Sequence, residues 1–201
     1  MLLSQNITLR RSKKIIFEDV NISLTSKKII ILKGKNGSGK TTLLKTLLNI
    51  IEPTSGIIYW KGKILNKNLY DFYRNITYIS DRTSSLRQLS VYENIKVWKR
   101  IYLSSFKFEQ IESILLMLNL DNYLNKKVSS LSLGEIKKLE LIRLILENKK
   151  IWLLDEPFTN LDKDTIKIMG QTFVDHCRNG GSILFSSHQN PEIEVSEEVN
   201  L

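Results

Sequence analysis

The stretch that decides the fold is GKNGSGKT, residues 34–41. It fits the pattern G-x-x-x-x-G-K-[ST], with Gly34, Gly39, Lys40 and Thr41 at the fixed places. Glycines let consecutive backbone N–H groups turn inward around phosphate oxygens. A helix that starts at the end of such a loop points its positive end at the same phosphates. The octet therefore predicts a nucleotide-phosphate loop, but many unrelated proteins hold phosphates in this way.

The segments on either side of the octet agree with this prediction. KKIIILKG, residues 27–34, is a continuous β-branched run typical of a buried strand, and TTLLKTLLNII, residues 41–51, predicts a helix. We expect Lys40 to neutralise charge on the β- and γ-phosphates and Thr41 to offer its hydroxyl to Mg²⁺. The predicted nucleotide contacts of this region are Gly34, Lys35, Asn36, Gly37, Ser38, Gly39, Lys40, Thr41 and Thr42.

Composition narrows the class of protein. The chain has 201 residues, of which 42% are hydrophobic, and this size suits one domain over residues 1–201. No apolar run approaches the roughly 20 residues that span a bilayer, and the N-terminus lacks the layout of a cleaved signal. The single cysteine, Cys177, excludes an internal disulfide and fits a reducing compartment. We therefore expect a protein that is soluble, or peripheral on a membrane.

The net charge of +9 has two interpretations. One is an anionic partner, either nucleic acid or the acidic face of a membrane. The other is a composition rich in scattered lysines. Because no motif combines aromatic and basic residues in the manner of nucleic-acid modules, we expect no nucleic-acid partner.

The rest of the chain alternates between strand and helix patterns. Residues 2–32 are expected to form short strands, and GIIYWKGK at 56–63 a strand followed by a turn at Gly62. Residues from about 84 to 133 change in character and predict a helical lobe inserted into the core. One helical stripe in that lobe contains Ile111, Ile114, Leu115 and Leu118.

Beyond the lobe, GEIKKLELIRLILEN at 134–148 predicts a helix, and KIWLLDE at 150–156 and SILFSSH at 182–188 predict strands. The acidic stretch PEIEVSEEVNL at 191–201 has no clear pattern and is expected to fray. Strands that alternate with helices favour a parallel sheet with right-handed crossovers. The sequence predicts an α/β fold of the P-loop NTPase type, with a mainly parallel sheet, antiparallel N-terminal strands and the inserted helical lobe.

A carboxylate pair ends the strand IWLL at 151–154. Parallel α/β sheets bind ligands where their strands end, so Asp155 is placed to hold the Mg²⁺ shell and Glu156 to polarise a water towards the γ-phosphate. An ordinary acidic strand end would look the same in isolation. Its occurrence together with the glycine octet favours the metal and catalytic roles.

Two further segments narrow the class. LSLGE, residues 131–135, resembles the signature loop of ABC ATPases, usually written LSGGQ. IWLLDEPFTNLD at 151–162 resembles the Walker B strand and D-loop of that family, and LFSSH ends in His188 at the place of its switch histidine. Kinases and small GTPases share the octet but not this succession. The chain therefore resembles an ABC cassette.

Within that family the resemblance is to the ATP-binding subunits of cytochrome c biogenesis (haem exporter) transporters, the CcmA subfamily. It rests on YISDRTSSLRQLSVYENIKVW at 78–98, DEPFTNLD at 155–162 and SSHQ at 186–189, and covers roughly residues 5–190. The alternatives are the ATPase subunit of another ABC transporter of unknown substrate, and a slow-turnover cassette that senses nucleotide.

The resemblance implies a mechanism shared between two copies. ATP bound with Mg²⁺ on one copy would be capped by Ser132 and Gly134 of a second copy, head to tail. Glu156 would serve as general base and His188 would reach the γ-phosphate. It also implies an integral membrane partner, CcmB-like, a role in haem delivery for c-type cytochrome maturation, and a peripheral place on the cytoplasmic face of the bacterial inner membrane, or on the matrix side in mitochondria.

Four positions depart from the family pattern. Leu133 replaces the third signature residue, usually Gly, and is expected to weaken closure, while Glu135 replaces Gln. The usual Q-loop glutamine is missing, and either Asp81 or Arg82 falls in its place. The aromatic that stacks on adenine is also missing; Arg11 lies near its place, whereas Phe17 fits the core better.

Overall fold

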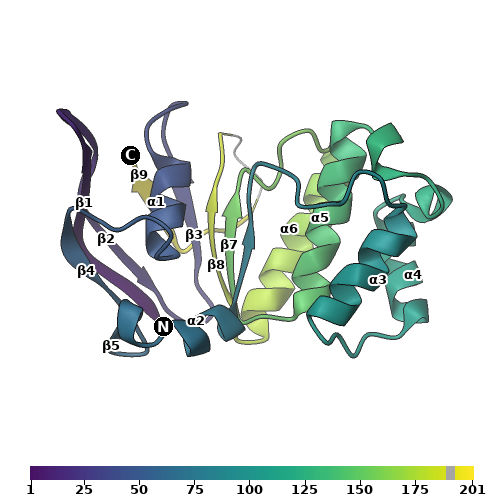
Figure 1. Ribbon diagram of the computed structural model, residues 1–201, viewed down its shortest axis with the longest axis horizontal. Helices are drawn as coiled ribbons and strands as arrows, with labels where there is room; N and C mark the ends of the chain where they lie inside the picture. Colours follow the sequence, from purple (N-terminus) through teal and green to yellow (C-terminus); the bar gives the residue numbers. More distant parts are fainter. Residues whose placement is uncertain (189–192) are drawn as a thin grey trace.

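Two sheets form the framework of the computed structural model, which describes residues 1–188 and 193–201 (Figure 1). The antiparallel sheet has the order β2-β1-β4-β5 and the parallel sheet the order β6-β7-β8-β3-β9. The strands are β1 (Leu2–Arg11), β2 (Lys14–Leu24), β3 (Ile29–Lys33), β4 (Ser55–Trp60), β5 (Lys63–Ile64), β6 (Ile76–Ile79), β7 (Ile151–Asp155), β8 (Ser182–Ser186) and β9 (Glu197–Asn200). The predicted α/β class is confirmed.

The helices form layers around the parallel sheet. They are α1 (Lys40–Leu47), α2 (Leu69–Asn75), α3 (Val91–Ile101), α4 (Phe108–Met117), α5 (Leu133–Glu147) and α6 (Lys163–Arg178), with single 3₁₀ turns at Leu65–Lys67, Asp121–Tyr123 and Val128–Ser130. Figure 1 shows α1 between the two sheets, α5 and α6 on the other face of the parallel sheet, and α3 and α4 outside α5. The helices α3 and α4 lie within the range predicted for the inserted lobe.

The continuous apolar strands are explained by two cores, one on each face of the parallel sheet. In β3, Ile29 and Ile31 pack towards α5 and α6, whereas Ile30 and Leu32 pack towards α1 and the antiparallel sheet. All residues of β7 are likewise buried. A parallel sheet covered on both faces requires such uninterrupted hydrophobic runs, which is why these strands do not alternate.

Helix α1 is shorter than predicted, because it ends at Leu47 and not at Ile51. Asn49 adopts a left-handed conformation with φ 56°. The N–H of Ile50 donates to the carbonyl of Lys45 at 2.9 Å, and the N–H of Asn49 donates to that of Thr46, also at 2.9 Å. This pair of bonds is the Schellman motif, which satisfies the last carbonyls and stops the helix.

The prediction that the acidic end of the chain frays is wrong for residues 197–200. They form β9, which pairs in parallel with β3 at the edge of the sheet. Lys33 Nζ lies 2.6 Å from Glu198 Oε1 and Lys28 Nζ 3.4 Å from Glu197 Oε2, so the last residue of β3 and the residue just before that strand pair with the glutamates. Gln189 of the predicted SSHQ segment, with Pro191 and Glu192, lies outside the described residues.

Buried charges join the helical lobe to the sheet. Arg143 on α5 lies between Glu140, at 3.1 Å, and Glu147, at 2.8 Å. Its guanidinium also stacks over Trp98 of α3, while Glu147 accepts a 2.8 Å bond from Thr77 of β6. Among the described residues, none of the helices combines the length and the apolar composition that crossing a bilayer requires.

One titratable ring lies between α6 and β7. His176 stacks on Trp152 with ring centroids 3.7 Å apart, and its Nε2 lies 3.2 Å from the carbonyl of Lys150. Burial lowers the pKa of this imidazole to about 4. Between pH 6.5 and 4 the unfolded chain therefore binds a proton that the folded chain does not, so acidification through this range lowers the free energy of unfolding.

We expect His176→Phe, which keeps a ring on Trp152 but removes the titration, to flatten this dependence. The wild type should lose about 1 kcal/mol more than the variant between pH 7 and pH 5, once screening of the partly exposed ring is allowed for. Urea unfolding at both pH values measures the difference. Equal losses in the two proteins would contradict a depressed His176 pKa.

Candidate nucleotide-binding and catalytic site

The parallel register brings three chain segments to one edge of the sheet. Leu32 of β3 pairs with Ser186 of β8, and Ser186 also pairs with Asp155 of β7. The octet follows β3, Glu156 follows β7 and His188 follows β8 within two residues. Segments far apart in the sequence therefore meet at the carboxyl ends of adjacent strands, where α/β sheets bind ligands.

A pocket of about 330 Å³ opens at this edge. Its lining consists of Ile16, Asn36, Gly37, Gly39, Lys40, Thr41, Thr42, Asp81, Asp155, Glu156 and His188. Gly39 is the N-cap that precedes α1 and has φ 108°, and a Cβ there would lie 3.0 Å from a side-chain carbon of Ile16, so the turn requires glycine. Gly34, Lys35 and Ser38 belong to the same loop but do not line the pocket.

Lys40 and His188, predicted from opposite ends of the chain, lie together. The Lys40 side chain is only 6% exposed, and its Nζ donates to the carbonyls of Gly34 at 2.8 Å and Lys35 at 3.2 Å. The same Nζ lies 3.3 Å from His188 Nε2. The cation is thus held at the octet, beside the predicted switch histidine.

Asp155 is oriented by a residue that the sequence analysis missed. Ser186 Oγ donates to Asp155 Oδ1 at 2.7 Å and accepts from the N–H of Glu156 at 2.9 Å. One hydroxyl therefore fixes both members of the carboxylate pair. Its sequence signal is weak, because a serine at a strand end two residues before a histidine is common.

Two buried oxygens indicate where a ligand belongs. Asp155 Oδ2 and Ser38 Oγ have no hydrogen-bond partner in the described part of the chain, although buried polar atoms are normally paired. No cluster of three His, Cys, Asp or Glu side chains among residues 1–188 and 193–201 could hold a metal alone. The chemistry fits Mg²⁺, which is usually held by one or two protein oxygens together with phosphates and water.

The Glu156 carboxylate faces His188, the predicted switch histidine. Glu156 has a left-handed backbone, φ 48°, which is uncommon for a residue with a side chain and occurs often at functional sites. Its Oε1 lies 3.1 Å from His188 Nε2, at an angle unsuited to a hydrogen bond, and its Oε2 accepts from the His188 N–H at 3.3 Å. Glu156 is 18% exposed and His188 40%, so both reach the mouth of the pocket.

The LSLGE segment forms the start of α5. Ser132 Oγ accepts from the N–H of Glu135 at 3.2 Å, and Glu135 Oε2 accepts from the N–H of Ser132 at 2.7 Å. This capping box explains why Glu is acceptable in place of Gln. A Cβ on Gly134 would lie 2.6 Å from the carbonyl of Asn160 in the D-loop, so the close approach requires glycine.

Ser132 and Gly134 do not line the octet pocket of their own chain, so the structure does not bring them to the other predicted contacts. Leu133 is 70% exposed at the surface between them. It lines an adjoining cavity of about 450 Å³ that also contains Asp81, Arg82 and Glu156.

Positions that the sequence left open are now placed. Asp81 lines the octet pocket, whereas Arg82 lines only the adjoining cavity, so Asp81 is the one that faces the carboxylate pair. Arg11 lines neither; Ile16 is the residue of the β1–β2 hairpin on the wall of the pocket. Phe17 is buried, as predicted.

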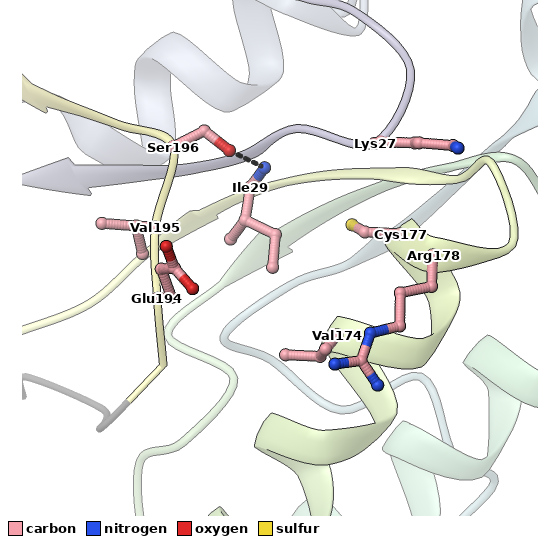
Figure 2. Close-up of a pocket in the computed structure, with 8 residues that line it drawn as sticks. All are labelled: Lys27, Ile29, Val174, Cys177, Arg178, Glu194, Val195 and Ser196. Atoms are coloured by element: carbon pink, nitrogen blue, oxygen red, sulfur yellow. Dashed lines mark hydrogen bonds between the residues drawn. The ribbon is translucent and has the colours of Figure 1, made fainter.

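A different hollow, of about 320 Å³, lies at the other end of β3 (Figure 2). Lys27, Arg178 and Glu194 surround it, and Ser196 Oγ accepts from the N–H of Ile29 at 3.1 Å. Cys177 lies on its wall, and burial raises the pKa of this thiol to about 11, which keeps it unreactive. None of the predicted site residues lies there, and it is at the amino end of the strand.

The fold and the octet pocket together define a P-loop ATP-binding cassette. The family described as ABC transporter matches residues 17–159. The cytochrome c biogenesis ATP-binding export protein CcmA of Reclinomonas americana is 37% identical over 192 residues, covering 94% of this chain and 85% of that protein.

Solved structures of ABC transporter cassettes have a similar fold. An ABC transporter ATP-binding protein of Pyrococcus furiosus superposes with TM-score 0.84 at 25% identity, covering 100% of this chain and 96% of the other. A dimeric structure of a bacterial ABC transporter cassette superposes with TM-score 0.78 at 23% identity, covering 94% and 88%. The chain belongs to the ABC transporter family and, within it, to the CcmA proteins. It is accordingly an ABC-type ATPase that binds ATP.

The positions of Lys40 and Glu156 in the pocket predict different effects of their substitution on ATP binding and on ATP hydrolysis. We expect Lys40→Ala to abolish ATP binding, because Lys40 is the one lysine among residues 1–188 and 193–201 that lines the octet pocket. Glu156→Gln should spare binding and lower the hydrolysis rate by about 10²–10⁴, the usual cost of losing a general base. Nucleotide titration and phosphate release measure the two effects. Hydrolysis by Glu156→Gln at the wild-type rate would remove Glu156 from the mechanism.

Proposed function

We propose that this chain is the ATP-hydrolysing subunit that energises a membrane transporter in haem delivery and c-type cytochrome maturation. The observation that carries the proposal is 37% identity over 94% of the chain to a CcmA protein, together with an intact octet, carboxylate pair and switch histidine. The other reading of the sequence, a cassette for a different transporter, keeps the same ATP chemistry and lacks this support.

The residues of the pocket have separate roles in hydrolysis. Loop N–H groups of residues 34–39 and the start of α1 cradle the phosphates, and Lys40 leaves the Gly34 and Lys35 carbonyls to reach the β- and γ-phosphates. Glu156 accepts the proton of the attacking water. His188 contacts the γ-phosphate and transmits its loss to Glu156, which its backbone N–H already contacts.

Mg²⁺ would be held by Thr41 and Asp155 and would neutralise the charge that develops on the transferred phosphate. Ser186 fixes Asp155 Oδ1, which leaves the unpartnered Oδ2 free to face the ion or its waters. Asp81, on the wall of the same pocket, takes the place of the missing glutamine as a contact for the metal shell.

A second copy completes the site head to tail. Ser132 and Gly134 lie outside the octet pocket of their own chain, and Leu133 between them is exposed, so this turn is available to another molecule. Ser132 and Gly134 would cap the γ-phosphate of the opposing octet. A cassette of similar fold has a dimeric structure, which supports an assembly of two copies. Leu133 adds bulk at the contact, which accounts for slower closure in the slow-turnover alternative.

The membrane partner is an integral subunit of the CcmB type, placed on the helical lobe and the segment around Asp81. That partner would hold this chain on the cytoplasmic face of the bacterial inner membrane, or on the matrix side of the mitochondrial inner membrane in an organelle.

The test of this role is replacement of the chain by Lys40→Ala in its own host. Covalently bound haem in c-type cytochromes should fall to near zero, because haem delivery depends on ATP turnover. Non-covalent haem in b-type cytochromes serves as the internal control and should stay unchanged. Normal c-type cytochromes in that host would overturn the proposed role and leave the ATPase assignment standing.

A further inference from the structure

A buried lysine of α5 lines the cavity next to the nucleotide pocket, and no motif accounts for it. Lys137, in the second turn of α5, is only 9% exposed. It lines the 450 Å³ cavity together with Asp81, Glu140 and Glu156. Lysine is rarely buried without a partner because desolvating an ammonium group is costly.

The carboxylate of α5 that lines the same cavity does not neutralise Lys137. Glu140, one turn further on, is saturated by the segment that follows β6. It accepts bonds from the backbone N–H groups of Ser84 at 2.8 Å and Ser85 at 2.7 Å, and from the hydroxyls of Thr83, Ser84 and Ser85. Arg143 supplies its ion pair.

The charge of Lys137 is therefore not neutralised by a salt bridge within the described residues. Within residues 1–188 and 193–201, its Nζ forms no close ion pair with a carboxylate, whereas the adjacent Lys138 pairs with Asp162 at 2.9 Å. Burial lowers the pKa of Lys137, while the charges of Asp155, Glu140, Asp81 and Glu156 raise it. The ammonium is therefore near the carboxylates of the nucleotide pocket without being bound to any of them.

We propose that Lys137 is a positioning residue of the ATP site, whose buried ammonium offsets the negative charge of Asp81, Asp155 and Glu156 until a metal ion and nucleotide enter. The inference rests on the roles proposed above for Asp155 and Glu156. Three carboxylates around one pocket would otherwise repel the phosphates. Lys137 attracts the nucleotide and opposes occupation of the carboxylates by a metal ion alone.

This role predicts opposite effects on two ligands. In Lys137→Met, metal-free ATP should bind about 5- to 20-fold more weakly, because an attractive charge is lost at low local dielectric. Mn²⁺ without nucleotide should bind more tightly by a similar factor, because a repulsive charge is lost. A fluorescent ATP analogue in EDTA measures the first affinity, and electron paramagnetic resonance of free Mn²⁺ measures the second.

Matched variants separate charge from structure. Lys137→Arg keeps the charge and should retain both affinities, and Lys137→Gln provides a second neutral variant should Lys137→Met fold poorly. Lys149→Met removes the same charge beyond the far end of α5 and should change neither affinity. A folded neutral variant with unchanged Mn²⁺ affinity, or with both affinities shifted in the same direction, overturns the inference.

The metal assignment has its own control. Asp155→Asn should weaken Mn²⁺ binding whatever residue stands at position 137. If Asp155→Asn binds Mn²⁺ as the wild type does, the proposed metal site is at fault. If only the Lys137 variants fail to respond, the inference about Lys137 fails and the metal site stands.

Discussion

The whole site depends on the parallel pairing of β3, β8 and β7. Their register aligns Leu32 with Ser186 and Ser186 with Asp155, so the chain leaves all three strands at one edge. A slip of one residue would turn Asp155 to the other face of the sheet and separate it from Ser186. The buried apolar runs on both faces prevent that slip, because each strand residue has a defined core to fill.

Helix α5 serves both the site and the lobe. Its first turn presents Ser132 and Gly134 at the surface, held by the capping box and by the close approach of Asn160. Its buried face carries Lys137, Glu140, Arg143 and Glu147 at spacings of three or four residues, with alternating charge. Glu140 ties Thr83, Ser84 and Ser85, the segment just after Asp81, to this helix.

Much of the fold and of the nucleotide site could be predicted from the sequence, because the features concerned depend on local sequence patterns. The octet can be identified from its own glycines and from the strand and helix patterns on either side. The strand β7 can be identified from its apolar run, which ends in two acidic residues. The pairing of Lys40 with His188 was predictable only through the resemblance to ABC cassettes, since 147 residues separate them.

The features that could not be predicted from the sequence depend on contacts between residues that are far apart in the chain. The strand β9 looked like an acidic tail, because its stability comes from Lys28, Lys33 and the open edge of β3. Glu140 and Lys137 lie in the helix predicted at 134–148, but the sequence does not show that both are buried, because their burial depends on the packing of α5 under the lobe. Ser186 has only a weak sequence signal, and its role is defined by the pairing of its strand with β7.

The central claim is that two copies share one site: the octet, Asp155 and His188 of one, and the start of α5 of the other. A crystal structure with Mg²⁺ and a non-hydrolysable ATP analogue tests it most directly. The account predicts the γ-phosphate between Lys40 and His188 of one copy and Ser132 and Gly134 of the second, with Lys40 released from the Gly34 carbonyl. An analogue bound with both signature turns facing solvent would contradict it.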